Sequence, residues 1–176
     1  MNEKLIVNHF QTPAGNLEVL HDEHSIFQSR FIDLAPITNE TKSSFVKPIY
    51  PISQQKLPVV EQILFELNEY FSDPHHRFQL KLSPIGTTYQ KTVWNSLLVI
   101  PAGRTVTYGE LSHQLNSSPR AIGQACKKNP LTIFIPCHRV IGQTNLGGYM
   151  GSSDAMQYKK NLLTHEGYIF KNSPEV

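Results

Sequence analysis

The pairing of residue types best suited to chemistry in this sequence is Cys137 followed directly by His138. A thiol becomes a strong nucleophile as its thiolate, and a nearby imidazole is the usual group that removes its proton. Adjacent residues of a regular strand point to opposite faces, so contact between these side chains requires a turn or a bridging water. Pro136 allows a break in a strand at this point. Taken alone, a Cys–His pair more often belongs to interior packing, so its surroundings decide the interpretation.

The residues before Cys137 are predicted to be mainly helical. Two capping boxes, Thr87 with Gln90 and Thr107 with Glu110, each open a helix, and Pro101 stops the first one. A capping box satisfies backbone donors that the first turn of a helix leaves free, so it marks where a helix begins.

A third helix is expected to begin at Ser118 with Pro119 in its first turn, and to run to about Lys128. Asn129-Pro130 ends it, because a residue before proline avoids the helical region. Together with the preceding short helix, which ends near Leu115, it resembles a helix-turn-helix pair. Helix pairs are also common in proteins that do not bind DNA.

The segment that carries Cys137 lies between this helix pair and a closing helix. Residues 132–135 are apolar and are expected to form a buried strand or extended segment. The closing helix is predicted from Asp154 to Glu166, with Gly167 as its C-terminal stop.

The first half of the chain shows strand patterns followed by one helix. Pro58 suits the first turn of that helix, and Asp73-Pro74 ends it. The expected strands cover residues 5–7, 17–20, 26–32 and 78–82, with a loop over residues 36–57. The predicted fold is therefore α+β: a small antiparallel sheet domain over residues 1–84, then a mainly helical domain over residues 85–176 that contains the helix-turn-helix and the active-site cysteine.

Composition and charge narrow the classes of partner. Residues 1–80 carry six Lys/Arg against ten Asp/Glu, whereas residues 81–176 carry ten against four. This asymmetry favours an acidic partner such as nucleic acid for the second half, although a scattered surface bias explains it equally well. Two cysteines are too few for a disulfide framework. No apolar run is long enough for a membrane span or a signal peptide, so we expect a cytoplasmic protein that is not secreted.

Short motifs surround Cys137 throughout the second half of the chain. In order, they are Tyr89, Val93-Trp94, Ile100-Pro101-Ala102-Gly103, Thr107-Tyr108-Gly109-Glu110-Leu111, Arg120-Ala121-Ile122-Gly123, Asn129-Pro130, Ile135-Pro136-Cys137-His138-Arg139-Val140-Ile141, Gly148-Tyr149, Leu162-Leu163 and His165-Glu166-Gly167. They closely resemble the O6-alkylguanine-DNA alkyltransferase family, also called methylated-DNA–protein-cysteine methyltransferases. The resemblance is strong over about half the chain and loose in the first half.

The resemblance implies a single-use repair reaction. Cys137 looks like the acceptor of the alkyl group of O6-methylguanine, and by extension of O4-methylthymine, in duplex DNA. His138 looks like the base, acting through water, and Glu166 looks like the group that orients its imidazole, as in a catalytic triad. A carboxylate near a helix C-terminus is otherwise slightly unfavourable. The product is a thioether, so one molecule repairs one lesion.

The same resemblance assigns contacts with the minor groove of DNA to the helix pair. Tyr108 looks like a residue that contacts the flipped base and a nearby phosphate, and that donates a proton to the leaving purine. Arg120 looks like the cation that fills the space that the base leaves in the stack. Ala121 and Gly123 are small enough to let the helix enter the groove, although tight packing explains Gly123 equally well. Asn129 looks like a tie between that helix and the active-site segment. Without the motif, Tyr108 would be interpreted as a half-buried tyrosine, Arg120 as a solvated arginine and Asn129 as a helix terminator.

The pocket for the base is expected to involve Val140, Tyr149 and Met150. Here the sequence departs from the family, because many members have a small residue and a pair of glycines after Gly-Tyr, whereas this chain reads Met150-Gly151-Ser152-Ser153-Asp154. Met150 therefore narrows the pocket or faces solvent. Some relatives bind zinc in the first domain through cysteines and histidines, but the first half of this chain has no cysteine. We expect no metal and no cofactor, His75-His76 in a solvated loop, Cys126 as a packed thiol, and a monomer that binds double-stranded DNA.

Two other functions remain open on the sequence. A sensor of alkylated DNA would bind the lesion without repairing it, but Cys137 argues against this function. A cysteine hydrolase would use Cys137 and His138 through many turnovers, but it leaves the basic second half and Arg120 unexplained.

Overall fold

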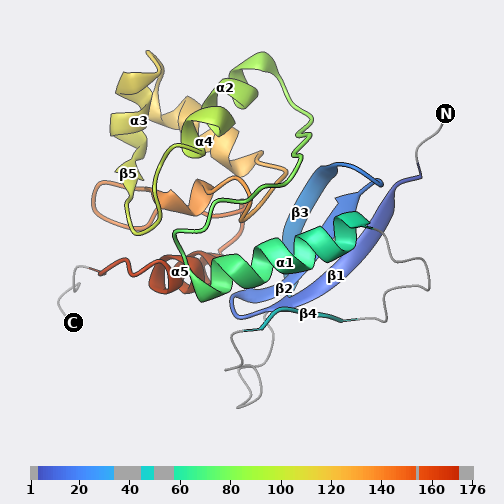
Figure 1. Cartoon of the computed structure of the whole chain (residues 1–176). Coiled ribbons are helices and arrows are strands. Elements are labelled where there is room, and N and C mark those ends of the chain that lie inside the picture. The colour runs from blue at the N-terminus through green and yellow to red at the C-terminus, as the bar shows by residue number, and fades with distance from the viewer. Residues whose placement is uncertain (1–3, 34–44, 50–57, 154, 171–176) are drawn as a thin grey trace.

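The computed structural model describes residues 4–33, 45–49, 58–153 and 155–170. Within these ranges no helix is both long and apolar enough to cross a membrane. Figure 1 shows a sheet and one long helix on one side of the molecule, and a group of shorter helices on the other. The predicted α+β class is confirmed.

The sheet is built from three longer strands and one short strand, and all of its neighbours are antiparallel. In the order β3-β2-β1-β4, these are β3 (Ile26–Asp33), β2 (Gly15–His21), β1 (Ile6–Thr12) and β4 (Lys47–Pro48). Side chains alternate between buried and half-buried along β2, as expected for a sheet with one face on the core. The strand β4 lies within the segment that was predicted to be a loop.

The long helix α1 (Pro58–Ser72) begins at its predicted proline and buries one face, which includes Ile63 and Leu67. The strand predicted at residues 78–82 is not formed. This stretch makes only an isolated bridge between Leu82 and Ile26, through the Ile26 amide to Lys81 at 2.9 Å and the Ser83 amide to Ile26 at 2.8 Å. The alternation of side chains therefore correctly indicated that one side of this stretch packs against the core. It did not indicate the regular hydrogen bonding of a β-strand.

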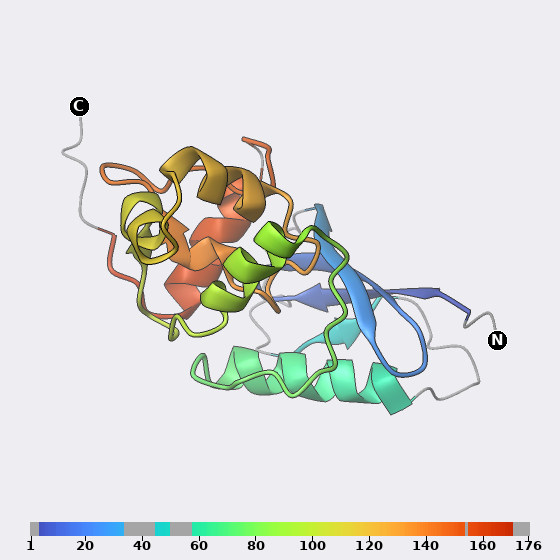
Figure 2. The same ribbon diagram turned by 90° about the horizontal axis from the view of Figure 1, so that it is seen from above.

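The second half begins with three helices in the predicted places. They are α2 (Thr88–Leu97), α3 (Tyr108–Gln114) and α4 (Pro119–Lys127). Both predicted capping boxes are present, and the Ser118 side chain accepts the amide of Ala121 at 3.2 Å to cap α4. The helices α3 and α4 pack against each other, with α2 against α4. Figure 2 shows this group from above, beside the sheet.

The segment leading to Cys137 is a turn rather than the predicted strand or extended segment. The Ile135 amide donates to the Leu131 carbonyl at 2.8 Å, and Ile133 has a left-handed φ of 71°. All of residues 131–138 are buried. Apolar composition predicted their burial correctly, but a short apolar run fits a buried turn as well as a strand.

Three further elements complete the fold around this turn. A 3₁₀ helix, η1 (Cys137–Arg139), leads into β6 (Val140–Ile141), which pairs in parallel with β5 (Val106–Thr107). The last helix, α5 (Met156–His165), ends before Gly167, whose φ of 75° fits the predicted stop. The predicted helix start at Asp154 lies outside the described residues.

Both halves of the chain contribute to one hydrophobic core. It includes Leu17 and Ile63 from the first half together with Trp94, Ile122 and Leu162 from the second. The Ser29 hydroxyl also donates to the Thr132 carbonyl at 2.7 Å, which ties β3 to the turn before Cys137. The division at residues 84 and 85 stays a prediction.

Candidate active site

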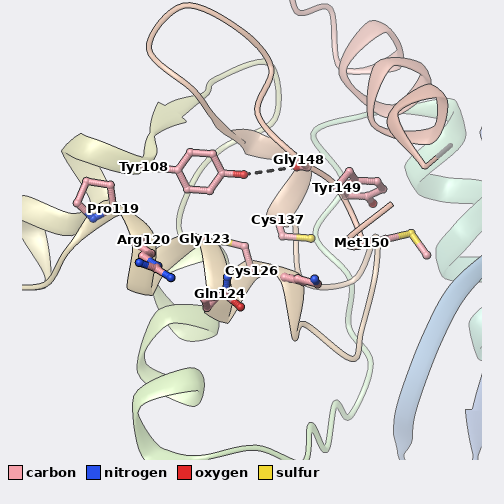
Figure 3. A pocket seen from close by; sticks show the side chains of 12 residues that line it. Tyr108, Pro119, Arg120, Gly123, Gln124, Cys126, Cys137, Gly148, Tyr149 and Met150 are labelled. Atoms are coloured by element: carbon pink, nitrogen blue, oxygen red, sulfur yellow. Dashed lines mark hydrogen bonds between the residues drawn. The ribbon is translucent and has the colours of Figure 1, made fainter. Parts of the chain in front are cut away.

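Cys137 lies at the first position of η1 and lines a cavity of about 480 Å³. This volume is within the usual range for small-molecule sites. Figure 3 shows Cys137 between residues of α4 on one side and Tyr149 and Met150 on the other. The lining residues are Tyr108, Pro119, Arg120, Gly123, Gln124, Cys126, Lys127, Cys137, Gly148, Tyr149, Met150 and Gly151. The thiol therefore faces a space between the second helix of the pair and a loop that precedes α5.

Asn129 connects the end of α4 to the turn that carries the thiol. Its Nδ2 donates to the Ile135 carbonyl at 2.9 Å and to the Cys137 sulfur at 3.2 Å, and its Oδ1 accepts the Leu131 amide at 3.0 Å. One amide side chain thus fixes the thiol relative to the helix. A residue that only ended the helix would not need these contacts.

His138 is completely buried and is held by a carboxylate from the end of α5. Its Nε2 lies 2.8 Å from Oε1 of Glu166. Glu166 also receives the Arg139 guanidinium, at 2.8 Å from Nη2, and the Tyr70 hydroxyl at 2.8 Å. Among the described residues the other ring nitrogen, Nδ1 of His138, has no hydrogen-bond partner. The imidazole therefore has one nitrogen fixed and the other free to exchange a proton.

The protonation states of these groups follow from burial and from their neighbours. Burial lowers the pKa of His138 below its usual value, although Glu166 opposes this shift. Burial also favours the neutral form of Glu166, but the hydrogen bonds and charges of His138 and Arg139 outweigh it and hold its pKa well below the usual range. At neutral pH the pair is a neutral imidazole next to a carboxylate, which suits a general base.

The Cys137 thiol does not ionise easily by itself. Burial raises its pKa, and this effect outweighs the opposing hydrogen bond from Asn129 and the charge of Lys159. A thiolate in this site therefore depends on a base that takes the proton as the reaction proceeds.

Tyr108 begins α3 and packs against the loop of residues 142–153 between β6 and α5, here called the pocket loop. Its hydroxyl donates to the Gly148 carbonyl at 3.4 Å (Figure 3). A Cβ on Gly147 would lie 2.7 Å from the Tyr108 ring, and Gly147 has a left-handed φ of 69°, so only glycine fits there. Burial, with the two nearby thiols, raises the pKa of Tyr108 to about 12. The phenol thus keeps its proton at neutral pH and can donate it.

The exposed face of α4 carries the charged and small residues of the pocket mouth. Arg120 and Lys127 are exposed and line the cavity, whereas Ala121 is half-buried beside them and outside the lining. A Cβ on Gly123 would meet its nearest neighbour, the Tyr108 ring, at 3.9 Å. This is an ordinary contact, so packing within the described chain does not require glycine at this position.

Two expectations about individual residues need correction, and one that was left open is narrowed. Val140 does not line the cavity, because its side chain is completely buried in the core. Met150 is half-buried against the core and lines the cavity, with a left-handed φ of 48°, so it does not simply face solvent. His75 is exposed as expected, but His76 is only partly solvated, since it is half-buried and its Nε2 lies 2.7 Å from Oε2 of the buried Glu66. No group of three metal-ligating side chains occurs in the described ranges.

Sequence reasoning missed several residues that shape this site. Arg139 and Tyr70 hold Glu166, and Cys126 forms part of the cavity wall. Lys159 is completely buried beneath the loop. Arg139 lies inside the recognised motif and could have been suspected, whereas Tyr70 and Lys159 reach the site only through tertiary packing.

Comparisons with known proteins identify the family to which this chain belongs. The family model described as 6-O-methylguanine DNA methyltransferase, DNA binding domain, matches residues 88–168. A methylated-DNA–protein-cysteine methyltransferase of Bacillus subtilis is 34% identical over 92% of this chain and 94% of its own length. The chain belongs to the family of methylated-DNA–protein-cysteine methyltransferases.

Other methylated-DNA–protein-cysteine methyltransferases and their structures are similar to this chain over different spans. The relative from Methanosarcina acetivorans is 42% identical over 58% of this chain, and the match spans 65% of that relative, slightly less than two thirds. The O6-methylguanine methyltransferase of Mycobacterium tuberculosis has a TM-score of 0.71 at 28% identity, covering 93% of both chains. A structure of the same organism's OGT in complex with DNA has a TM-score of 0.68 at 28% identity, covering 92% of both chains.

Proposed function

We propose that this protein transfers the alkyl group of O6-methylguanine in duplex DNA to the sulfur of Cys137, once per molecule. The observation that carries the proposal is the position of this thiol in the wall of the cavity, opposite the pocket loop and next to α4. A family member with this arrangement has both an acceptor atom and a space for a base. The DNA-bound relative from M. tuberculosis supports DNA as the partner.

DNA approaches along the exposed face of α4, from the minor-groove side. The lesion leaves the stack and enters the cavity, because a base inside a duplex is not accessible to a buried thiol. Arg120 occupies the space that the base leaves, and Ala121 and Gly123 allow close approach of the helix. Unstacking costs a few kcal/mol, and a cation in the gap offsets part of it.

The chemical step is an in-line displacement at the alkyl carbon. His138 takes the thiol proton, directly or through one water at its free Nδ1, while Glu166 holds the imidazole. The sulfur–carbon bond forms as the carbon–O6 bond breaks, and the bonding electrons leave with the purine. Tyr108, which stays protonated near neutral pH, donates a proton to the purine. No cofactor is required, because substrate and acceptor together hold all the reacting atoms.

The product explains the single turnover. The carbon–sulfur bond of the thioether is stable, because breaking it would require expelling the Cys137 thiolate from an unactivated alkyl carbon. The protein therefore has no route back to the free thiol. O4-methylthymine presents a similar alkyl carbon and is a second substrate. We place the reaction in the cytoplasm, carried out by a monomer.

The test is to mix the protein with duplex DNA that carries O6-methylguanine, measure the intact mass, and map the adduct. One methyl group per protein on Cys137 supports the proposal. DNA binding without transfer would support a sensor instead, and many turnovers would support a hydrolase.

A further inference from the structure

Lys159, on the inner face of α5, is a buried cation that the reaction described above does not use. Its side chain is completely buried, and its Nζ donates to the carbonyls of Val140 at 2.6 Å, Leu146 at 2.6 Å and Gly148 at 3.3 Å. An ammonium has three donors, and these three carbonyls use all of them.

Burying an ammonium group is expensive for a fold. Taking such an ion out of water costs several kcal/mol, which backbone carbonyls recover only in part. Burial accordingly lowers the pKa of Lys159 to about 8. An apolar side chain of similar length would fill the same space without this penalty. The presence of a buried cation therefore suggests that the backbone geometry it holds has a function.

The three carbonyls belong to the connection between the nucleophile and the opposite wall of the cavity. Val140 directly follows η1, whereas Gly148 begins the pocket wall formed by residues 148–151. The Gly148 carbonyl also accepts the Tyr108 hydroxyl at 3.4 Å. One ammonium therefore ties the turn that carries Cys137 to the wall that faces it.

This wall has a backbone that needs to be held. Within the wall, Met150 and Gly151 have left-handed φ values of 48° and 73°, and Gly147, which directly precedes it, has a φ of 69°. For a non-glycine residue such as Met150 this conformation costs on the order of 1 kcal/mol and persists only where the surroundings enforce it. The contacts of Lys159 with Leu146 and Gly148 supply that restraint directly before the strained stretch.

We propose that Lys159 is a positioning residue for alkyl transfer, whose ammonium holds the wall of residues 148–151 at the separation from Cys137 that an alkylated base requires. This inference rests on the proposed function, in which the base occupies that separation. The same positive charge favours the Cys137 thiolate, against the effect of burial on the thiol. Lys159 is not among the residues that line the cavity, so it acts through the backbone that it holds and through its charge.

The chain offers a matched control on the next residue. Lys160 lies on the same helix but is exposed. Lys159→Met keeps the length of the apolar stem and removes the three donors, and Lys160→Met makes the same chemical change on the surface. Three quantities are measured: the single-turnover rate of methyl transfer at saturating duplex, the Kd for undamaged duplex, and the rate at which iodoacetamide alkylates Cys137.

We expect Lys159→Met to lower the rate of methyl transfer on the order of 10- to 100-fold, because small misplacements in a reacting complex have effects of this size. Its Kd should stay near the wild-type value, since the exposed face of α4 is unchanged. Iodoacetamide needs the thiol but no base pocket, so its rate should fall less. Lys160→Met should change none of the three.

A wild-type transfer rate in Lys159→Met would overturn the positioning role, and so would equal losses with DNA and iodoacetamide. Neither result affects the proposed function, which fails only if wild-type protein and Lys160→Met transfer no methyl group. If Lys159→Met does not fold, Lys159→Gln, which keeps an amide donor, is measured in the same way. Hydrogen exchange of residues 141–151 should then be faster in Lys159→Gln than in Lys160→Met, and equal exchange would overturn the proposal.

Discussion

The Nε2 atom of His138 lies 2.8 Å from Oε1 of Glu166, and both side chains are completely buried. The two residues are separated in sequence by the whole pocket loop and by α5. The last helix therefore brings this carboxylate back to the turn that carries Cys137 and His138. Arg139 and Tyr70 bind the same carboxylate. This arrangement fixes the ring of His138 and leaves Nδ1 as its only nitrogen able to exchange a proton during alkyl transfer.

Replacing the carboxylate should therefore impair the reaction more than the fold. We expect Glu166→Gln to lower the single-turnover rate of methyl transfer on the order of 10²-fold, because a misoriented imidazole loses most of a general base's contribution. Stability should fall by about 1–3 kcal/mol through the weakened contacts to Arg139 and Tyr70. Rapid-quench assays and urea unfolding measure the two effects. Glu69→Gln, an exposed carboxylate on α1, is the control, and equal rates for both variants would remove Glu166 from the mechanism.

Replacing the acceptor should separate binding from repair. We expect Cys137→Ser to bind duplex DNA with nearly the wild-type Kd and to transfer no methyl group, because the hydroxyl is a far weaker nucleophile at neutral pH. Intact mass after incubation with O6-methylguanine duplex, together with a binding titration, checks both parts. Any demethylation of the DNA by this variant would mean that the acceptor lies elsewhere.

The sequence predicted those parts of the site that depend on local chemistry or on a motif. Capping boxes located α2 and α3, and Ser118-Pro119 located α4, because these signals act within one turn of a helix. Residues 132–135 are buried as expected but form a turn, not the expected strand or extended segment, because burial of a short apolar run does not determine its backbone.

The contributions of Tyr70 and Lys159 could not be predicted from the sequence. Tyr70 reaches Glu166 across 96 residues of sequence, and Lys159 binds carbonyls that local signals do not place. The Val140 side chain was misplaced for a related reason. The motif names the residue, but only the pairing of β6 with β5 turns its side chain into the core.

Gly123 allows a test of how closely α4 approaches DNA. We expect Gly123→Ala to raise stability by about 0.5–1 kcal/mol, because alanine favours helix and its Cβ meets only the Tyr108 ring at 3.9 Å. Repair of duplex DNA should nevertheless fall, because the added methyl group projects toward the groove. Gly109→Ala in α3 is the control, with its nearest neighbour at 3.7 Å and no place in the cavity lining. Undiminished repair by Gly123→Ala would mean that the approach of α4 to DNA does not require glycine at this position.

Arg120 should matter only when a base must leave a duplex. It is exposed at the mouth of the cavity and away from the buried His138–Glu166 pair. We expect Arg120→Ala to slow repair of duplex DNA several-fold or more while leaving transfer from free O6-benzylguanine almost unchanged. Lys128→Ala, at the other end of α4, is the control for general loss of positive charge. Equal losses on both substrates would count against a role in base extrusion.

The buried His138 should make stability depend on pH in a predictable direction. Burial lowers its folded-state pKa below 6.5, whereas the unfolded chain keeps the ordinary value. As pH falls below 6.5, the unfolded state therefore binds a proton that the folded state does not, and stability falls until the folded pKa is reached. Above pH 6.5 both states are neutral at this residue and its contribution is constant.

Glu166, which binds His138, affects stability in a separate and lower pH range. The pKa of Glu166 is lowered from 4.5, so the stability it contributes is present above pH 4.5 and is lost as pH falls further. Between pH 6.5 and 5 the wild-type protein should lose up to about 1.4 kcal/mol per pH unit more than His138→Gln, whose side chain does not titrate. Urea unfolding of both proteins at several pH values and constant ionic strength measures the difference. Parallel curves would mean that His138 binds its proton as readily in the folded protein as in the unfolded chain, and the neutral base on which the transfer step depends would then be lost already at mildly acidic pH.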